Sequence, residues 1–370
     1  MTHSPGTLTS GQTGAGARAE VPAAYSEDYP LLEWIPELKG IITMENTGLF
    51  PTPVEALPFS RNAWIKRDDQ SHEEYGGNKI RKLAFIIADA KEKSARRLVT
   101  FGAIGTNHGV ATAMMCQRAG LECVIYLFDQ PVTDTVRKNL RLMQYYGARL
   151  VYKGSLFKTV LAFYASPFHL ERGSYFLFAG GSNVYGTLAF VNAACEFQNQ
   201  VLAGHCPEPE IIVCPVGSSA TLAGLSYGCQ LLGMKTRVMG VRVAPAKLGP
   251  FAACTPGTVY GLMKEVHSFL KPYRTDLPVP EQPWLVDSYY GDGYGVATEE
   301  GACAIELFGR HGIALEQTYT AKAGAAFLDQ LESAAGPVLF WNTYNSSDMS
   351  RQADSVRPQQ LPVALRKFLI

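Results

Sequence analysis

Residues 76–79, Gly-Gly-Asn-Lys, place a lysine directly after two glycines, and a lysine in that setting can act as a nucleophile. A neutral lysine amine attacks a carbonyl carbon to form a Schiff base, whereas a protonated amine does not. Two adjacent glycines let the preceding turn adopt conformations that other residues avoid. The alternative is a solvated surface lysine after a Gly-Gly turn, and these four residues alone leave both interpretations open.

The segment after the glycines predicts a helix from Asn78 to about Ser94. Its apolar residues recur at helical spacing and form one buried stripe, which consists of Ile80, Leu83, Ala84 and Ile87. Lys79 then lies in the first helical turn, where unpaired N–H groups make the local field positive. We expect this field, together with Arg81 and Lys82, to favour the neutral amine.

A second candidate site lies between a predicted strand at 210–216 and a predicted helix that begins near Thr221. Small residues let backbone N–H groups approach an anion, and a helix start adds partial positive charge. The segment consists of Gly217, Ser218, Ser219, Ala220 and Thr221. It fits a phosphate-binding loop, but Ser and Thr are also common N-caps of ordinary helices.

A third candidate site, Thr106-Asn107-His108, also lies at a predicted strand-to-helix junction. Ligands bind at such junctions in open α/β sheets. His108 can relay a proton near neutral pH, or it can simply pack at the start of the helix. The sequence favours neither role for His108.

Predicted strands and helices alternate along the chain, which indicates an α/β fold with mostly parallel strands. The predicted strands lie at 97–102, 122–128, 149–153, 210–216 and 237–243. The predicted helices lie at 108–119, 135–146 and 183–197, the last near the junction of two lobes. Residues 276–282 contain prolines and are predicted to form a surface loop.

The composition excludes several classes of protein. The chain has 370 residues, and 47% of them are hydrophobic, which is enough apolar content for two lobes. Its net charge is zero, which indicates neither nucleic acid nor a membrane surface as a partner. Eight cysteines without metal-ligand spacing indicate buried thiols in the cytoplasm and predict no metal site. No GxGxxG follows a strand, which argues against a dinucleotide-dependent oxidoreductase. Residues 1–24 are predicted to be a disordered tail, and no membrane helix is predicted.

Residues 67–69 (Arg-Asp-Asp), 76–83 and 102–108 together carry a family resemblance. The chain resembles the pyridoxal-phosphate enzymes of the tryptophan-synthase β fold, which is fold type II. The branch it resembles contains D-cysteine desulfhydrase and 1-aminocyclopropane-1-carboxylate deaminase, and that branch has Gly-Gly-Asn-Lys-x-Arg-Lys-Leu where this chain has residues 76–83. The resemblance extends from Pro51 to about Phe340.

The resemblance implies two domains, each an open, twisted, mostly parallel sheet flanked by helices. It places pyridoxal 5'-phosphate in the cleft between them. It implies a large domain of residues 25–82 and 190–370, and a small domain of residues 83–189.

The resemblance also implies roles for the first two candidate sites. Lys79 would hold the cofactor as a Schiff base, with Asn78 beside it as a further cofactor-binding residue. Residues 217–221 would hold the cofactor phosphate, although Ser219 and Ala220 stand where the family usually has glycines.

By the same resemblance, Asn107 would bond the phenolic oxygen of the cofactor, and Thr106 and His108 would belong to the loop that receives the substrate carboxylate. Thr106 stands where the family has serine. Its hydroxyl group could also take part in catalysis, while its added methyl group is expected to narrow the pocket.

Two late segments match family motifs. The first segment is similar to the family motif Tyr-Gly-x-Pro-x-Glu-Gly and consists of Tyr294-Gly295 followed by Glu299-Glu300-Gly301. The second segment, residues 319–322, is similar to Tyr-Thr-Gly-Lys or Tyr-Glu-Gly-Lys. In the family the residue after the second tyrosine, here Thr320, faces the pyridine nitrogen. A hydroxyl there makes the ring a weaker electron sink than a carboxylate would. A weaker sink suits β-elimination. Tyr294 and Tyr319 would transfer a proton or gate the site; without the resemblance they are core aromatics.

Other segments depart from the family pattern. Glu316-Gln317-Thr318 stands where Asp-Pro-Val is usual, and residues 342–345 stand where His-Thr-Gly-Gly is common. Both segments are expected near the cofactor ring, and Tyr344 is expected to contact the substrate. The departures imply a remodelled pocket and a substrate that differs from those of the named enzymes.

The resemblance implies a lyase or deaminase acting on a small amino acid. The expected reaction is α-proton abstraction and β-elimination of a C–S or similar bond, which yields a 2-oxo acid and ammonia. Alternatives are ring-opening deamination, β-replacement, formation of a carbon–carbon bond, and a catalytically silent ligand-binding homologue. The family also implies a homodimer.

Overall fold

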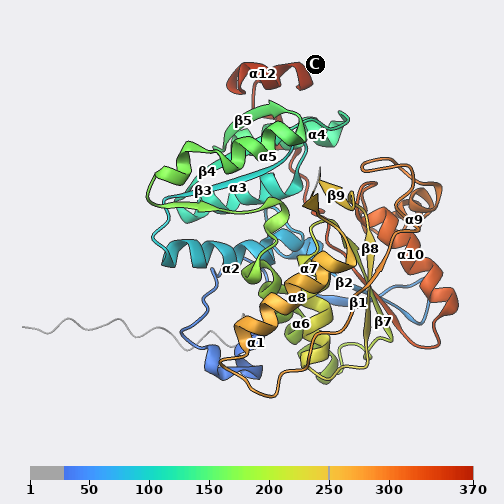
Figure 1. Cartoon of the computed structure of the whole chain (residues 1–370). Coiled ribbons are helices and arrows are strands. Elements are labelled where there is room, and N and C mark those ends of the chain that lie inside the picture. Colours follow the sequence, from blue (N-terminus) through green and yellow to red (C-terminus); the bar gives the residue numbers. More distant parts are fainter. Residues whose placement is uncertain (1–28, 249–250, 370) are drawn as a thin grey trace, which may run out of the picture.

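The computed structural model describes residues 29–248 and 251–369, which form two α/β lobes (Figure 1). The predicted tail, residues 1–24, lies outside the described residues. One lobe contains a four-stranded sheet and the other a six-stranded sheet, both open and flanked by helices, so the predicted fold class is confirmed. Within the described ranges, no helix has the length and apolar character needed to cross a bilayer.

The four-stranded sheet has the order β5-β4-β3-β6, and all its strands are parallel. The strands are β3 (Arg97–Ala103), β4 (Glu122–Phe128), β5 (Arg149–Gly154) and β6 (Ser174–Phe176). One face shares a core with α2 (Asn78–Glu92), α3 (Asn107–Ala119) and α4 (Asp134–Tyr145), and the other packs on α5 (Leu156–Tyr164). Successive β4 residues face opposite layers, as a strand requires: Ile125 lies in the first core and Tyr126 in the second.

The six-stranded sheet has the order β1-β2-β12-β7-β8-β11, in which only β1 and β2 are antiparallel. The strands are β1 (Val54–Ala56), β2 (Ala63–Lys66), β7 (Ile211–Val216), β8 (Arg237–Arg242), β11 (Trp284–Val286) and β12 (Val338–Trp341). One face is covered by α1 (Pro30–Trp34), α6 (Val184–Leu202), α7 (Ala220–Leu231) and α8 (Pro256–Leu270), and the other by α9 (Glu299–Gly309) and α10 (Thr320–Ser333). The central strands β7 and β12 are fully buried apolar runs, as expected between two helix layers.

Two smaller features extend from the large sheet. A ribbon of β9 (Lys247–Leu248) and β10 (Phe251–Ala252) follows β8 and lies between the lobes (Figure 1). After β12 the chain returns to the other lobe through α11 (Ser350–Asp354) and α12 (Val363–Arg366). There it adds buried side chains to the core of α2, α3 and α4, namely Met349, Ala353, Val356, Leu361 and Leu365. The predicted domain boundaries stay a prediction.

Helix α2 packs on α6 of one lobe and on α3 of the other. A buried polar network fixes its first turns. Arg81 donates to Asp68 (2.9 Å) and to Glu196 (2.7 Å), Lys66 donates to Glu196 (2.5 Å), and Trp341 donates to Asp68 (2.7 Å). Burial alone would raise the pKa of Glu196, but the charges of Arg81 and Lys66 outweigh it and hold that pKa at about 2.

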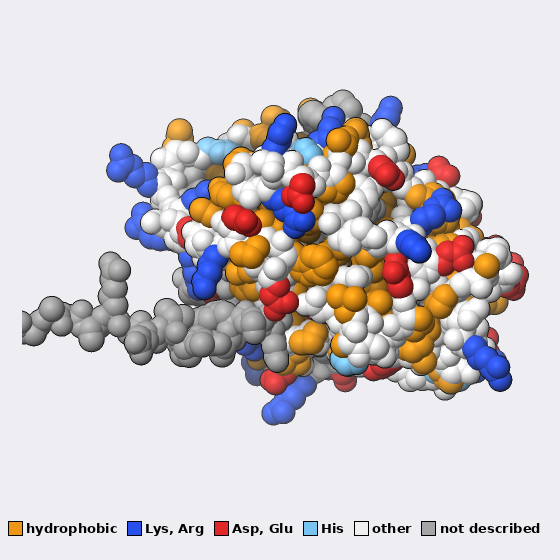
Figure 2. Space-filling model, turned by 90° about the horizontal axis from the view of Figure 1, so that it is seen from below, with side chains coloured by type: hydrophobic (Ala, Val, Ile, Leu, Met, Phe, Trp, Pro, Cys, Tyr) orange, Lys and Arg blue, Asp and Glu red, His pale blue; other side chains and the backbone are white. Residues whose placement is uncertain are grey.

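Most of the predicted elements lie close to the observed ones. The predicted helix at 78–94 ends at Glu92, and the predicted strand at 122–128 matches β4. The predicted helix at 183–197 continues to Leu202, and residues 276–282 form neither helix nor strand. Figure 2 shows one face of the molecule, where Lys and Arg side chains lie among Asp and Glu side chains, in keeping with the net charge of zero.

Candidate active site

A cavity of about 570 Å³ lies between the lobes, where the parallel strands of both sheets end. This is the place where open α/β sheets bind ligands. The structure brings together on its wall every predicted catalytic, cofactor-binding and substrate-binding residue except Ala220, namely Asn78, Lys79, Thr106, Asn107, His108, Gly217, Ser218, Ser219, Thr221, Tyr294, Tyr319, Thr320 and Tyr344. Ala220 is the first residue of α7 and is fully buried.

The glycine turn before Lys79 is set by contacts with the segment after β12. Gly77 has a φ of +97°, and a Cβ there would lie 2.9 Å from the carbonyl oxygen of Thr343. The backbone N–H of Asn78 donates to that same oxygen at 3.2 Å. Residues with a side chain would therefore be both strained and crowded at Gly77, and α2 starts with Lys79 directed at the cavity.

Lys79 has one hydrogen-bond partner among the described residues, the Oδ1 atom of Asn78 at 2.9 Å. Burial of its ammonium group lowers the pKa of Lys79 to about 8. The cause is burial and not the neighbouring cations proposed from the sequence, because Arg81 is bound to Asp68 and Glu196. A neutral amine is thus accessible near physiological pH.

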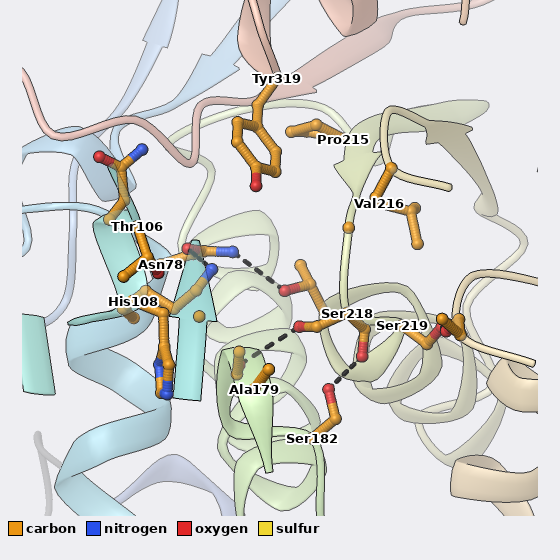
Figure 3. Close-up of a pocket in the computed structure, with 18 of the residues that line it drawn as sticks. Asn78, Thr106, His108, Ala179, Ser182, Pro215, Val216, Ser218, Ser219 and Tyr319 are labelled. Atoms are coloured by element: carbon orange, nitrogen blue, oxygen red, sulfur yellow. Dashed lines mark hydrogen bonds between the residues drawn. The ribbon is translucent and has the colours of Figure 1, made fainter. Parts of the chain in front are cut away.

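Asn78 connects the lysine to the loop at 217–221. Its Oδ1 accepts from Lys79, and its Nδ2 donates to Oγ1 of Thr221 at 3.1 Å (Figure 3). The loop itself is packed tightly, because a Cβ on Gly217 would lie 3.0 Å from the Tyr319 ring. The start of α7 then presents its first N–H groups at the cavity.

Ser219 has an unusual backbone, with a φ of +69°. Its hydroxyl donates to the carbonyl oxygen of Ala253 (3.2 Å) and bonds Oγ1 of Thr258 (3.1 Å). These bonds connect the loop to the residues that follow the β9–β10 ribbon and to the start of α8. The backbone of Ser219 belongs to the loop, while its hydroxyl group is engaged elsewhere.

The side of the loop toward the other lobe contains a second buried lysine. The Nζ atom of Lys82 lies 3.4 Å from both Oγ of Ser218 and the carbonyl oxygen of Gly180. Burial, and then the charge of Lys79, lower the pKa of Lys82 well below its ordinary value. Ser182 donates to the backbone oxygen of Ser218 beside it (Figure 3). Lys82 does not line the cavity itself, and its Nζ atom reaches the loop through Ser218.

Asn107 is oriented by a residue that the sequence did not single out. Its Oδ1 accepts from Nδ2 of Asn139 at 2.8 Å, and Asn139 also donates to the carbonyl oxygen of Gly105 at 2.8 Å. Asn139 is buried in α4 among apolar neighbours. Because its oxygen is occupied, Asn107 has its amide N–H groups left for the cavity.

Thr106 and His108 are engaged within the protein. The Thr106 hydroxyl caps α3 by accepting from the N–H of Gly109 at 3.2 Å, and its methyl lies against Gly102 and Gly109. His108 is bonded through Nε2 to Thr100 (3.0 Å). Burial, then the charges of nearby lysines, lower the pKa of His108 to about 3, so the ring is neutral. This geometry supports packing over proton relay for His108.

Tyr294 and Tyr319 form a pair above the loop, with hydroxyl oxygens 2.7 Å apart. Burial raises the pKa of Tyr294 to about 12 and raises that of Tyr319 further, so both phenols are protonated at neutral pH. The Tyr319 hydroxyl points into the space between Asn78 and Ser218 (Figure 3).

Glu316 lies in the cavity wall beneath the tyrosine pair, and three backbone N–H groups at the start of α10 surround its carboxylate. Burial raises the pKa of Glu316 against these bonds. The hydroxyl oxygen of Thr320 accepts from the N–H of Glu316 at 2.9 Å. Glu316 therefore caps α10 and positions Thr320 in the wall.

A family model of pyridoxal-phosphate dependent enzymes matches residues 46–343, most of the chain. The chain belongs to this family. A solved structure of an ACC deaminase homologue is 27% identical, with a TM-score of 0.73, and the match covers 87% of this chain and 97% of that one.

More distant solved structures share the fold of this pyridoxal-phosphate enzyme. Threonine deaminase isoform 2 from Solanum lycopersicum is 13% identical, with a TM-score of 0.60 and coverage of 88% of this chain and 92% of that one. Maize serine racemase is 15% identical, with a TM-score of 0.57 and coverage of 88% and 95%. The family match establishes pyridoxal 5'-phosphate as the cofactor and the protein as an enzyme of fold type II.

The cavity fits this cofactor by its own chemistry. The amine of Lys79 can reach an aldehyde, and the start of α7 matches a phosphate, with the Nζ atom of Lys82 3.4 Å from Oγ of Ser218 in the same loop. The free amide of Asn107 matches a phenolic oxygen. Sequence reasoning missed Lys82 and Asn139 as site residues. Their signals were a second lysine one helical turn after Lys79 and an asparagine within the apolar stripe of α4.

Proposed function

We propose that this enzyme is a lyase that removes an α-proton and a β-substituent from an amino acid and yields a 2-oxo acid and ammonia. The observation that carries the proposal is Lys79, a cavity-facing amine with a pKa of about 8 beside a phosphate-type loop. Support also comes from the 27% identical ACC deaminase homologue, whose name indicates an ammonia-releasing reaction.

Each site residue is given a role by its contacts. Bound pyridoxal phosphate supplies an aldehyde that condenses with amines and a ring that stabilises negative charge at the α-carbon. Lys79 holds the cofactor and, once substrate has displaced it, accepts the α-proton at Nζ. The loop at 217–221, which Lys82 contacts at Ser218, holds the phosphate, and Asn107, oriented by Asn139, bonds the phenolic oxygen.

The tyrosine pair is assigned to proton donation. With its pKa raised to about 12, Tyr294 has a neutral phenol that gives up a proton only to a strong base. The short bond between the two hydroxyl oxygens lets either phenol replace a proton that the other has donated. Tyr294 and Tyr319 are therefore proposed to protonate the leaving group or the product carbon.

Thr320 favours elimination over the alternatives. By the family pattern this position faces the pyridine nitrogen, and a hydroxyl there keeps the ring a weaker electron sink than a carboxylate would. Elimination needs less electron withdrawal by the ring, because the leaving group takes the electron pair. Ring-opening deamination is the second candidate, favoured by the ACC deaminase homologue.

The first experiment is an absorbance spectrum of the purified enzyme and of Lys79→Ala, before and after borohydride reduction. We expect a visible band for lysine-linked cofactor that is absent from Lys79→Ala, and reduction should attach the cofactor permanently to the peptide that contains Lys79. Lack of a band after pyridoxal phosphate is added would sink this mechanism and favour the silent homologue.

Product analysis separates the chemical alternatives. Elimination releases a 2-oxo acid and ammonia from D- or L-amino acids with a β-leaving group. Ring opening releases 2-oxobutyrate from the cyclopropane amino acid, and β-replacement yields a new amino acid without ammonia. The homodimer remains a prediction from the family resemblance, and the cytoplasmic location remains a prediction from the cysteines.

A further inference from the structure

Each strand of the four-stranded sheet has an apolar residue on the cavity wall at or near its carboxyl end. Phe101 belongs to β3, Phe128 ends β4, Leu156 follows β5, and Phe178 follows β6. The four-stranded lobe therefore forms an apolar wall of the cavity around the polar segment at 106–108.

The six-stranded lobe contributes a second apolar surface to the same cavity. It comes from the segment after β8, from the end of the β9–β10 ribbon and from α8, and consists of Pro245, Ala252, Ala253 and Leu262. The polar groups assigned to the cofactor, namely Lys79 and the loop at 217–221, line the same cavity. A substrate that reaches Lys79 thus enters a cavity with apolar surface from both lobes.

Apart from Lys79, which is assigned to the cofactor, the described lining residues include no buried charge that is left free to bind a charged side chain. None of its described residues is an arginine. Lys247 and Glu265 carry opposite charges and are both exposed to solvent, where ionic contacts are weak. The carboxylate of Glu316 is already bonded to three backbone N–H groups.

Phe178 presents apolar surface on the wall of the cavity. Its side chain is 38% exposed although it lines the cavity, and its ring packs on Phe101 at 5.0 Å in an edge-to-face arrangement. Exposed aromatic surface is unfavourable in water, and an apolar ligand group that covered it would bind more tightly.

We infer that the substrate of this enzyme carries an uncharged, apolar side chain larger than that of cysteine, which lies between the two apolar surfaces. The inference rests on the proposed function, since it assigns the substrate class of that same site.

The test is a titration of the cofactor absorbance band of the holoenzyme with amino acids, in both configurations. Alanine, 2-aminobutyrate, norvaline, norleucine and phenylalanine form an apolar series, and aspartate and lysine test charge. We expect the concentration for half-maximal change to fall about fourfold per added methylene, with aspartate and lysine binding no better than alanine.

Matched variants locate the contact. Phe178→Ala and Leu156→Ala should weaken phenylalanine binding about tenfold and leave alanine binding unchanged. Their controls are Phe157→Ala and Leu161→Ala, two exposed residues of α5 outside the cavity wall, which should leave both unchanged.

Two failures are distinguishable. Absence of any cofactor band contradicts the proposed function itself. A band whose response is independent of side-chain size, or strongest for aspartate or lysine, overturns the apolar substrate class while the proposed function stands. The wild-type series alone decides this, so the inference stays testable if a wall variant does not fold.

Discussion

Ser219 shows how one residue in the loop serves a second purpose. A non-glycine residue with positive φ is strained by about 1 kcal/mol, and glycine would remove that strain. The serine hydroxyl, however, bonds Ala253 and Thr258, which follow the ribbon. The side chain therefore offsets backbone strain by anchoring the ribbon segment to the loop.

Substitutions at Ser219 should separate these two effects. Ser219→Ala loses the hydroxyl bonds and keeps the strain, so we expect a loss of about 1 kcal/mol in the free energy of unfolding. Ser219→Gly loses the bonds and the strain together and should be more stable than Ser219→Ala by about 1 kcal/mol. Urea denaturation measures both. The control is Ser333, the last residue of α10, where the alanine variant should instead be more stable than the glycine variant. If the alanine variant were the more stable one at both positions, the backbone of Ser219 would not be strained.

The lowered pKa of Lys79 has a kinetic consequence for cofactor capture. At a pH below 8, a lysine with a pKa of about 8 has roughly 300-fold more neutral amine than one at the ordinary 10.5. We expect the rate at which apoenzyme captures pyridoxal phosphate to rise tenfold per pH unit and to level off above about pH 8. Stopped-flow absorbance between pH 6 and 10 measures this rate, and an inflection near pH 10 would show an ordinary lysine.

At the scale of single elements, α2 depends on the charges beneath it. Arg81→Met would leave Asp68 and Glu196 buried without their shared cation, which costs about 3–5 kcal/mol of unfolding free energy. The matched control is Arg97→Met in β3, where Arg97 pairs with the more exposed Glu122. This substitution should lower the unfolding free energy by less than about 1 kcal/mol. Equal losses for the two variants in urea denaturation would show that the network does not stabilise α2.

Glu196 makes the same network sensitive to acid. Its pKa in the folded protein is about 2, below the ordinary 4.5, so its contribution is complete above pH 4.5 and is lost as the pH falls toward 2. The shift corresponds to about 3 kcal/mol. We expect wild type to lose more unfolding free energy than Glu196→Gln between pH 5 and pH 3. An identical loss in the two proteins would assign the acid sensitivity to other carboxylates.

The elements that the sequence predicted well are those with long internal periodicity. Helix α2 and strand β4 were placed within two residues of their bounds, because each has a complete apolar pattern of its own. Strands of three residues such as β1, β6 and β11 contain too little pattern to detect. The site followed the same rule: the motif around Lys79 was found, but Asn139 is paired with Asn107 only through the packing of α4 on α3.

At the scale of the whole molecule, the chain ends on the lobe opposite to its last strand. Residues after β12 complete the core of the four-stranded lobe, in which Leu365 is fully buried. We expect Leu365→Ala to lower the free energy of unfolding by about 2–3 kcal/mol. Val363→Ala, on the same helix but 75% exposed, should change it by less than about 0.5 kcal/mol. Thermal or urea denaturation of the pair would refute this packing if both variants matched wild type.

The position of β12 between β2 and β7 has a consequence for the order of synthesis. Strands β1 and β2 are synthesised long before β12, which is the parallel neighbour of β2 in the sheet. Until β12 is made, β2 lacks its parallel neighbour, Asp68 lacks the hydrogen bond from Trp341, and the turn before Lys79 has no Thr343 to pack against. We therefore expect a chain that lacks β12 to bind pyridoxal phosphate poorly, because the turn before Lys79 depends on a segment that is made after every other strand of both sheets.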